Sequence, residues 1–230
     1  MKLGFLLCLA LIVATSCRTA RYASSTIKSV PKSENDLLEC RNGWLQTTSG
    51  RMISYLRDQC NSTRFDGVSY CALSGWLMYG VDDRAISHLG DKCSTKYFSS
   101  DAYCDSHQWL RKTTDGRAVA NLGDKCTTQY FSSFAYCDSL GWLRTIADDR
   151  AISNLDNKCT TDYFSAVAYC DSQGWLRLLS NDRPVTNLDM NCNRKFFDDT
   201  KYCKDGSIRS ILTDEPIGMG DCKTAFPRHQ

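Results

Sequence analysis

The chain has few histidines and almost no net charge, and both shortages limit its function. Three histidines occur among 230 residues, at positions 88, 107 and 229, without a repeated spacing. No repeated Ser-His-Asp or Cys-His set can be assembled from them, so we expect surface histidines and no enzyme. The formal net charge is +2, which gives no bulk field to attract nucleic acid or an acidic membrane surface.

Long apolar runs are also scarce. One run, Leu3 to Ala14, follows a single lysine near the start of the chain. It is too short for a stable membrane span and is typical of the core of a signal peptide. We therefore predict a signal peptide over residues 1–16, cleavage before Cys17, and no transmembrane helix.

Cys17 has two interpretations. Ala14 and Ser16 stand three and one residues before the expected cut, which suits an ordinary signal peptidase. The same stretch resembles the lipobox of bacterial lipoproteins, whose cysteine becomes the lipidated first residue, although that motif usually begins with leucine. We predict an exported cell-envelope lipoprotein anchored at Cys17, with a soluble secreted protein as the alternative. The polar residues 17–39 predict a flexible tether.

Cysteine is the residue type that the chain has in abundance. Fourteen cysteines in a chain of this size indicate an oxidising compartment. Their spacings, C-x10-C and C-x21-C, are not those of zinc sites. The acidic turns lack the alternating oxygen ligands of a calcium loop. We therefore expect disulfides, no metal and no cofactor.

A period of 33 residues runs from residue 40 onward. An arginine recurs at Arg51, Arg84, Arg117, Arg150 and Arg183, and a leucine at Leu56, Leu89, Leu122, Leu155 and Leu188. A tryptophan keeps the interval within one residue at Trp44, Trp76, Trp109, Trp142 and Trp175. Self-similarity of this length is typical of a solenoid, a propeller or a tandem array.

Each unit is predicted to contain a β-hairpin followed by a short helix. Turn-forming pairs mark the hairpins at Ser49-Gly50, Asp82-Asp83, Asp115-Gly116, Asp148-Asp149, Asn181-Asp182 and Asp214-Glu215. The ten residues that link units begin with an N-cap type of residue, and Tyr163, Phe164, Val167 and Ala168 fit one face of a short helix. The predicted fold class is an α+β disulfide-rich tandem repeat.

The hairpins also predict the disulfides, because each brings its two flanking cysteines opposite one another. The resulting pairs are Cys40–Cys60, Cys71–Cys93, Cys104–Cys126, Cys137–Cys159, Cys170–Cys192 and Cys203–Cys222. A rival scheme pairs each C-x10-C internally and joins Cys40 to Cys222 in a closed five-unit ring. Cysteines eleven residues apart along a helix lie roughly 16 Å apart, so we favour the first scheme and an open array.

The first scheme defines a repeat domain over residues 40–222. Its six units are 40–60, 71–93, 104–126, 137–159, 170–192 and 203–222, and a loose tail follows at 223–230. In the last unit Ile208 is expected at the tryptophan position and Pro216 at the arginine position. Such degenerate terminal units are typical of the capping repeats of an array.

The repeated tryptophan and arginine are the candidate binding residues, and they have two interpretations. In the structural one, each tryptophan is the core of its hairpin, and each arginine stacks on a neighbouring tryptophan or bonds a turn carboxylate. In the binding one, they form a ladder of identical sites for a sugar face or a peptide carboxylate. We favour the structural interpretation, because repeats must keep their interface residues whatever they bind. The residues concerned are Trp76, Trp109, Trp142, Trp175, Arg84, Arg117, Arg150 and Arg183.

These observations predict a non-catalytic repeat protein of the cell surface or envelope. It would present its units to a glycan or a protein partner and would not bind nucleic acid. It would contact a membrane only through a lipid on Cys17. The alternative is a disulfide-rigidified spacer with no specific ligand.

Overall fold

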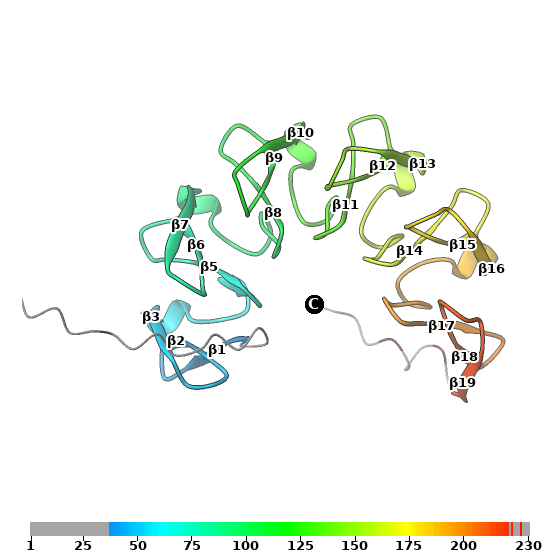
Figure 1. Ribbon diagram of the computed structural model, residues 1–230, viewed down its shortest axis with the longest axis horizontal. Coiled ribbons are helices and arrows are strands. Elements are labelled where there is room, and N and C mark those ends of the chain that lie inside the picture. Colours follow the sequence, from blue (N-terminus) through cyan, green and yellow to red (C-terminus); the bar gives the residue numbers. More distant parts are fainter. Residues whose placement is uncertain (1–36, 221, 223–225, 227–230) are drawn as a thin grey trace, which may run out of the picture. The chain divides into compact units, whose positions relative to one another are not determined.

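The computed structural model describes residues 37–220, Cys222 and Phe226 (Figure 1). The predicted signal peptide, Cys17 and the predicted tether up to residue 36 lie outside the described residues. The predicted tail also lies outside them, except for Phe226, which is buried.

Six small antiparallel sheets follow one another along the chain (Figure 1). The first sheet consists of β1 (Leu38–Arg41), β2 (Trp44–Thr47) and β3 (Met52–Tyr55). The second consists of β4 (Phe65–Asp66), β5 (Ser69–Cys71), β6 (Trp76–Tyr79) and β7 (Arg84–His88). The third consists of β8 (Ala102–Cys104), β9 (Trp109–Lys112) and β10 (Ala118–Asn121). The fourth sheet consists of β11 (Ala135–Cys137), β12 (Trp142–Thr145) and β13 (Ala151–Asn154). The fifth consists of β14 (Ala168–Cys170), β15 (Trp175–Leu178) and β16 (Pro184–Asn187). The sixth consists of β17 (Lys201–Lys204), β18 (Ser207–Ser210) and β19 (Pro216–Met219).

The predicted hairpins are confirmed at all six turns. In the fourth unit, for example, β12 pairs antiparallel with β13 across the turn at Asp148-Asp149, with a register shift next to the turn. A strand that the sequence analysis missed completes each sheet on the other side: β11 pairs with β12 and ends at Cys137, the first cysteine of the unit. Each unit is therefore a three-stranded meander, with a fourth short strand in the second unit.

The predicted linker helices are wrong, and with them the α+β class. Residues 37–220 contain no α-helix, and their helical segments are 3-10 turns that directly follow the repeated leucine: η1 (Arg57–Gln59), η2 (Gly90–Lys92), η3 (Gly123–Lys125), η4 (Asp156–Lys158) and η5 (Asp189–Asn191).

The linkers reverse direction instead of forming a helix. In the linker before unit five, Phe164 pairs with Tyr169 as an antiparallel bridge. The hydroxyl of Ser165 accepts hydrogen bonds from the backbone N–H of Val167 and Ala168 at 3.1 and 3.0 Å. Tyr163, Val167 and Ala168 pack in or against one core cluster, whereas Phe164 packs in the preceding one. Because the chain turns back between these residues, their spacing resembles helical periodicity without a helix.

All six predicted disulfides are confirmed, with Cα–Cα distances of 5.5 to 5.6 Å. Cys40 bonds Cys60, and Cys222 bonds Cys203. The closed five-unit ring is therefore excluded and the array is open. Six disulfides fit an extracellular or exported protein, and within the described part of the chain no helix is long and apolar enough to cross a membrane.

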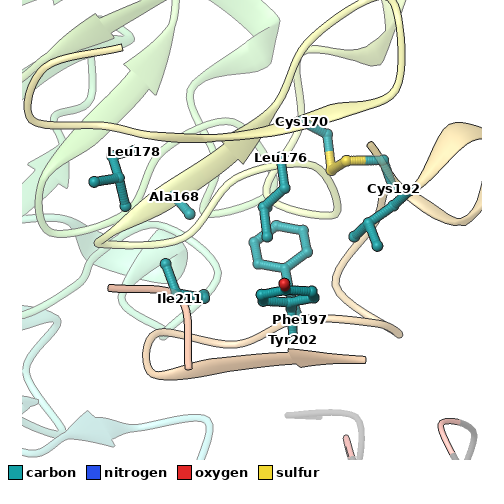
Figure 2. Close-up of a cluster of buried hydrophobic side chains, with 9 residues drawn as sticks. Ala168, Cys170, Leu176, Leu178, Cys192, Phe197, Tyr202 and Ile211 are labelled. Atoms are coloured by element: carbon teal, nitrogen blue, oxygen red, sulfur yellow. A yellow bond between two sulfur atoms is a disulfide. The ribbon is translucent and has the colours of Figure 1, made fainter. Parts of the chain in front are cut away.

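The core is a series of clusters, each shared by two consecutive units. The cluster of unit five contains Leu176 and the Cys170–Cys192 disulfide, together with Phe197, Tyr202 and Ile211 from the following linker and unit. Figure 2 shows the rings of Phe197 and Tyr202 close to Leu176. Units this small cannot bury much surface alone, so the shared cluster supplies core that a single unit lacks.

The backbones of successive linkers are also hydrogen-bonded to one another. Four bonds of 2.7 to 2.8 Å repeat along the array, each from a backbone N–H to a carbonyl oxygen one linker earlier: Thr95 to Thr63, Thr128 to Lys96, Thr161 to Gln129, and Arg194 to Asp162. Consecutive units are thus joined by side-chain packing, and consecutive linkers by a backbone hydrogen bond.

The two terminal units differ from the others in the turn that follows their first cysteine. This turn is a tight two-residue connection at Asn42-Gly43 and at Asp205-Gly206, with positive φ at all four residues. That conformation is the type I′ turn which Asn-Gly and Asp-Gly sequences favour.

The tight turn of the last unit corrects two predicted positions. Because the turn is one residue shorter, Ile208 pairs with Cys203 as Leu176 does with Cys170. Ser207, not Ile208, therefore takes the tryptophan position, where it pairs with Met219. Pro216 pairs with Arg209 as Pro184 does with Arg177, which leaves Glu215 at the arginine position.

Candidate functional site

The repeated tryptophan is exposed rather than central to its hairpin. Four indoles at equivalent positions keep 37 to 41% of their surface accessible, namely Trp44, Trp76, Trp109 and Trp142, and Trp175 is half-buried. The core position belongs to the next residue along each strand, a fully buried leucine: Leu45, Leu77, Leu110, Leu143 and Leu176. Neighbouring residues of a strand point to opposite faces. The prediction that tryptophan forms the core of each hairpin is therefore wrong.

An aspartate after the first cysteine of units three, four and five positions the tryptophan backbone. In unit four, Asp138 Oδ1 accepts hydrogen bonds from the backbone N–H of Leu140 and Trp142, both at 2.9 Å. Its Oδ2 accepts from Arg144 Nε at 2.8 Å. Asp105 and Asp171 bond the matching tryptophans in the same way.

An arginine two residues after each of these tryptophans continues the network. Arg111, Arg144 and Arg177 pair with the aspartates of their own units at 2.5 to 2.8 Å. Nη1 of each also donates to a turn carbonyl, that of Gly116, Asp149 or Asp182. The sequence analysis missed this second arginine series, which the repeated Trp-Leu-Arg triplet could have indicated.

The turn aspartates are held by a buried tyrosine. The hydroxyl groups of Tyr136, Tyr169 and Tyr202 donate to the carboxylates of Asp149, Asp182 and Asp214. Burial and the adjacent carboxylate raise the pKa of Tyr202 to about 12, so this hydroxyl remains a neutral donor at physiological pH. The network orders the hairpin turn.

The Asp105 carboxylate is ionised at the same pH. Burial alone would raise its pKa, but the hydrogen bonds from Arg111 and from the backbone of Trp109 and His107 outweigh that effect and lower the pKa. The charge of Asp105 is therefore compensated within its own unit.

A polar side chain lies beside each internal tryptophan on the neighbouring strand. Trp109, Trp142 and Trp175 pair with asparagines, respectively Asn121, Asn154 and Asn187, whereas Trp76 pairs with His88 at a ring distance of 5.2 Å. Oδ1 of each asparagine caps the 3-10 turn by accepting a backbone N–H two residues later. Their Nδ2 groups donate to no other residue within the described chain.

The arginine series with the 33-residue spacing bonds between units, as the structural interpretation expects, but to backbone carbonyls rather than to a neighbouring tryptophan or a turn carboxylate. Arg84, Arg117, Arg150 and Arg183 are exposed. Three members of the series donate Nη2 to a backbone carbonyl of the next unit, in the pairs Arg51 to Gly80, Arg117 to Ala147, and Arg183 to Leu212. Arg84 lies over the ring of Tyr79 instead. The structure does not place these arginines together with the tryptophans as paired binding groups.

The described surface is hollowed beside the last unit and among the linkers. One hollow, of about 310 Å³, is lined by Ser207, Arg209, Tyr202, Thr186 and Lys204, where the last unit lacks a tryptophan. The other, of about 670 Å³, lies among three consecutive linkers and Phe226, where Arg194 pairs with Asp199. Each hollow contains one ion pair, Arg209–Asp214 in the first and Arg194–Asp199 in the second, and no cluster of three or more metal-ligating side chains is found in the described residues.

Comparisons with known proteins assign no relative. No family model matches the chain, and no curated protein matches it.

Proposed function

We propose that this chain is an exported, disulfide-rigidified and non-catalytic repeat protein that binds a glycan through its exposed tryptophans. The disulfide-rich repeats fit an extracellular structural protein, and the proposal adds a ligand to that coarser assignment. The observation that carries it is the accessible indole at the same position of successive units, beside a leucine that already forms the core.

The surroundings of the indole favour a sugar over other ligands. An exposed aromatic face suits the apolar face of a pyranose ring, and the neighbouring asparagine amide supplies a donor for a sugar hydroxyl. Identical sites at regular intervals suit a polymer of identical sugars, because each additional contact is intramolecular once the first has formed.

A glycan array probed with the full oxidised chain tests this proposal. After a ligand is found, Trp109→Ala and Trp142→Ala are each expected to weaken binding about tenfold, and the double variant by more than either. Leu140→Ala is the matched control, because Leu140 is 74% exposed and lies two residues from Trp142. Binding that survives the double substitution, or is lost equally with Leu140→Ala, would contradict the proposal.

A structural spacer without a ligand is the second candidate. It is favoured by the bonds between units and by the internally compensated charges of the turns. A glycan array on which the folded protein binds no glycan would support this alternative. A protein ligand that needs the same tryptophans would replace the glycan and keep the binding role.

Anchoring through a lipid on Cys17 remains a prediction. Mass spectrometry of the mature N-terminus separates the two forms, since a lipoprotein would carry a diacylglyceryl group on Cys17 and the secreted form would not.

A further inference from the structure

Asn61 lies in a sequence context that occurs once in the chain. It begins the triplet Asn61-Ser62-Thr63, and no other asparagine is followed by a serine or threonine two residues later. This triplet is the acceptor sequence for N-linked glycosylation when it lies on the surface of a secreted protein. All three residues are exposed.

The triplet already has a defined local conformation. Asn61 Oδ1 accepts a hydrogen bond from the backbone N–H of Thr63 at 2.9 Å and a second one from the Thr63 hydroxyl at 2.6 Å. The first of these closes an Asx-turn. Both bonds use the oxygen of the amide, so Nδ2 remains directed away from the turn and donates to no other described residue.

The surrounding structure holds this turn in place. Cys60, the preceding residue, is bonded to Cys40. On the other side, the carbonyl oxygens of Ser62 and Thr63 accept hydrogen bonds from the side chain and the backbone of Thr95 at 3.3 and 2.8 Å. The acceptor is therefore fixed at both ends while its side chain faces solvent.

A second asparagine shows what the acceptor needs beyond the turn. Asn193 has the place of Asn61 in the linker before unit six, and its Oδ1 accepts the backbone N–H of Lys195 at 3.0 Å. Lys195 stands where Thr63 stands, so the hydroxyl donor is missing. The two linkers share a turn, and only the first has the complete triplet.

We propose that Asn61 carries an N-linked glycan. Asn61 Nδ2 would attack the anomeric carbon of a polyprenyl-pyrophosphate-linked oligosaccharide. In this transferase-catalysed step the new C–N bond would form as the carbon–oxygen bond to the pyrophosphate breaks. The polyprenyl pyrophosphate would leave with the electron pair, and the amide would give one proton to a base of the transferase. The Thr63 hydroxyl positions the amide oxygen during this step.

The test uses the full chain produced in a eukaryotic secretory cell line and the same protein purified from its own source. Enzymatic release of N-glycans in heavy-oxygen water is expected to convert Asn61 to a labelled aspartate, found by mass spectrometry, and to increase electrophoretic mobility. Asn61→Gln and Thr63→Ala are expected to abolish both changes. Ser62→Ala and Thr63→Ser, which keep the asparagine and the hydroxyl, are expected to retain them.

Two outcomes would overturn the inference. The first is an unmodified Asn61 in the secreted, disulfide-bonded protein from either source. The second is a glycan that persists in Thr63→Ala. Binding to the glycan array is measured on the same samples, so failure of the proposed tryptophan sites is recorded separately from failure of this modification.

Discussion

At the scale of single residues, the linker before unit two departs from the internal linkers at one buried and one partly buried position. Ser69 stands where other units have a fully buried alanine at positions 102, 135 and 168, and Asp66 stands where they have a serine. The Ser69 hydroxyl has no hydrogen-bond partner among the described residues. Ser69 and Asp66 are each more polar than the residue at the equivalent position of the internal linkers. We therefore expect each of them to affect the stability of the protein.

We expect Ser69→Ala to stabilise the protein by about 1 kcal/mol. A buried hydroxyl without a partner costs the free energy of removing it from water, and alanine already fits the equivalent positions. Denaturant unfolding of the oxidised protein would measure the change, with Ser74→Ala as an exposed control. A lower free energy of unfolding for Ser69→Ala would contradict this argument.

Asp66 predicts a pH dependence. Burial, with a further contribution from Asp101, raises the pKa of Asp66 to about 6, whereas an unfolded aspartate has a pKa of about 3.9. Between these values the folded state binds the proton more tightly, so the contribution of Asp66 is greatest below about pH 4 and falls as the pH rises through 6. The Asp66→Ser variant, which restores the residue of the internal units, is expected to remove this loss in melting temperatures measured from pH 4 to 7. If the difference in melting temperature between Asp66→Ser and the unsubstituted protein is the same at every pH in that range, the pH dependence does not come from Asp66.

At the scale of the elements, the two arginine series bond different parts of the array: one bonds within its own unit, and three members of the other bond the next unit. Arg144 leaves about 29% of its side chain exposed and bonds Asp138 and the Asp149 carbonyl within its own hairpin. Arg150 is exposed, although its series recurs every 33 residues along the sequence. A regular interval identifies a repeated position but does not show how far its side chain is buried.

We expect Arg144→Ala to lower the free energy of unfolding by about 1–3 kcal/mol. The substitution removes charged hydrogen bonds and leaves the partly buried Asp138 without its cation. Arg150→Ala is the matched control from the same hairpin and should change stability by no more than about 0.5 kcal/mol. Equal losses in the two variants, measured by thermal unfolding, would show that the exposed series also stabilises the array.

The hairpins and all six disulfides could be predicted from the sequence because they depend on local signals. Asp115-Gly116 and its counterparts specify turns, and a hairpin then brings its flanking cysteines together. The strand ending at Cys137 could not be found in this way, because its residues, Ala135 to Cys137, are buried and show no alternation. Glycine positions such as Gly141 also depend on tertiary packing: a Cβ there would lie 2.7 Å from the Cα of Asp156.

The predicted burial of the tryptophans was the main error at the candidate site. Trp142 and Leu143 are adjacent large apolar residues, and a strand can bury only one of two neighbours against a single core. The sequence does not show which one faces the core. The choice is settled by packing against Phe164 and Tyr169, which come from the next linker.

At the scale of the whole molecule, each unit depends on its neighbours. Ile152 packs against the cluster that unit four shares with the following linker, whereas Ile217 at the equivalent place in the last unit is 63% exposed. Strand pairing stays within the units, and the shared clusters join one unit to the next. The stability of such an array is approximately the sum of the stabilities of its units and of the interfaces between neighbouring units. A substitution in a central unit therefore affects two interfaces, whereas one in a terminal unit affects one.

Removal of a central disulfide is therefore expected to affect more of the chain than removal of a terminal one. The double variant Cys137→Ser/Cys159→Ser should lose about 3 kcal/mol, because the closed loop no longer restricts the unfolded state. Hydrogen exchange should then accelerate in unit four and on both sides of it. Tyr136 packs in the cluster of unit three, and the cluster of unit four contains Tyr169 and Leu179 from the following linker and unit. Cys203→Ser/Cys222→Ser should accelerate exchange only in unit six and the cluster it shares with unit five. Exchange that accelerates over all units in both variants would show that the array unfolds as one cooperative body rather than through neighbouring pairs.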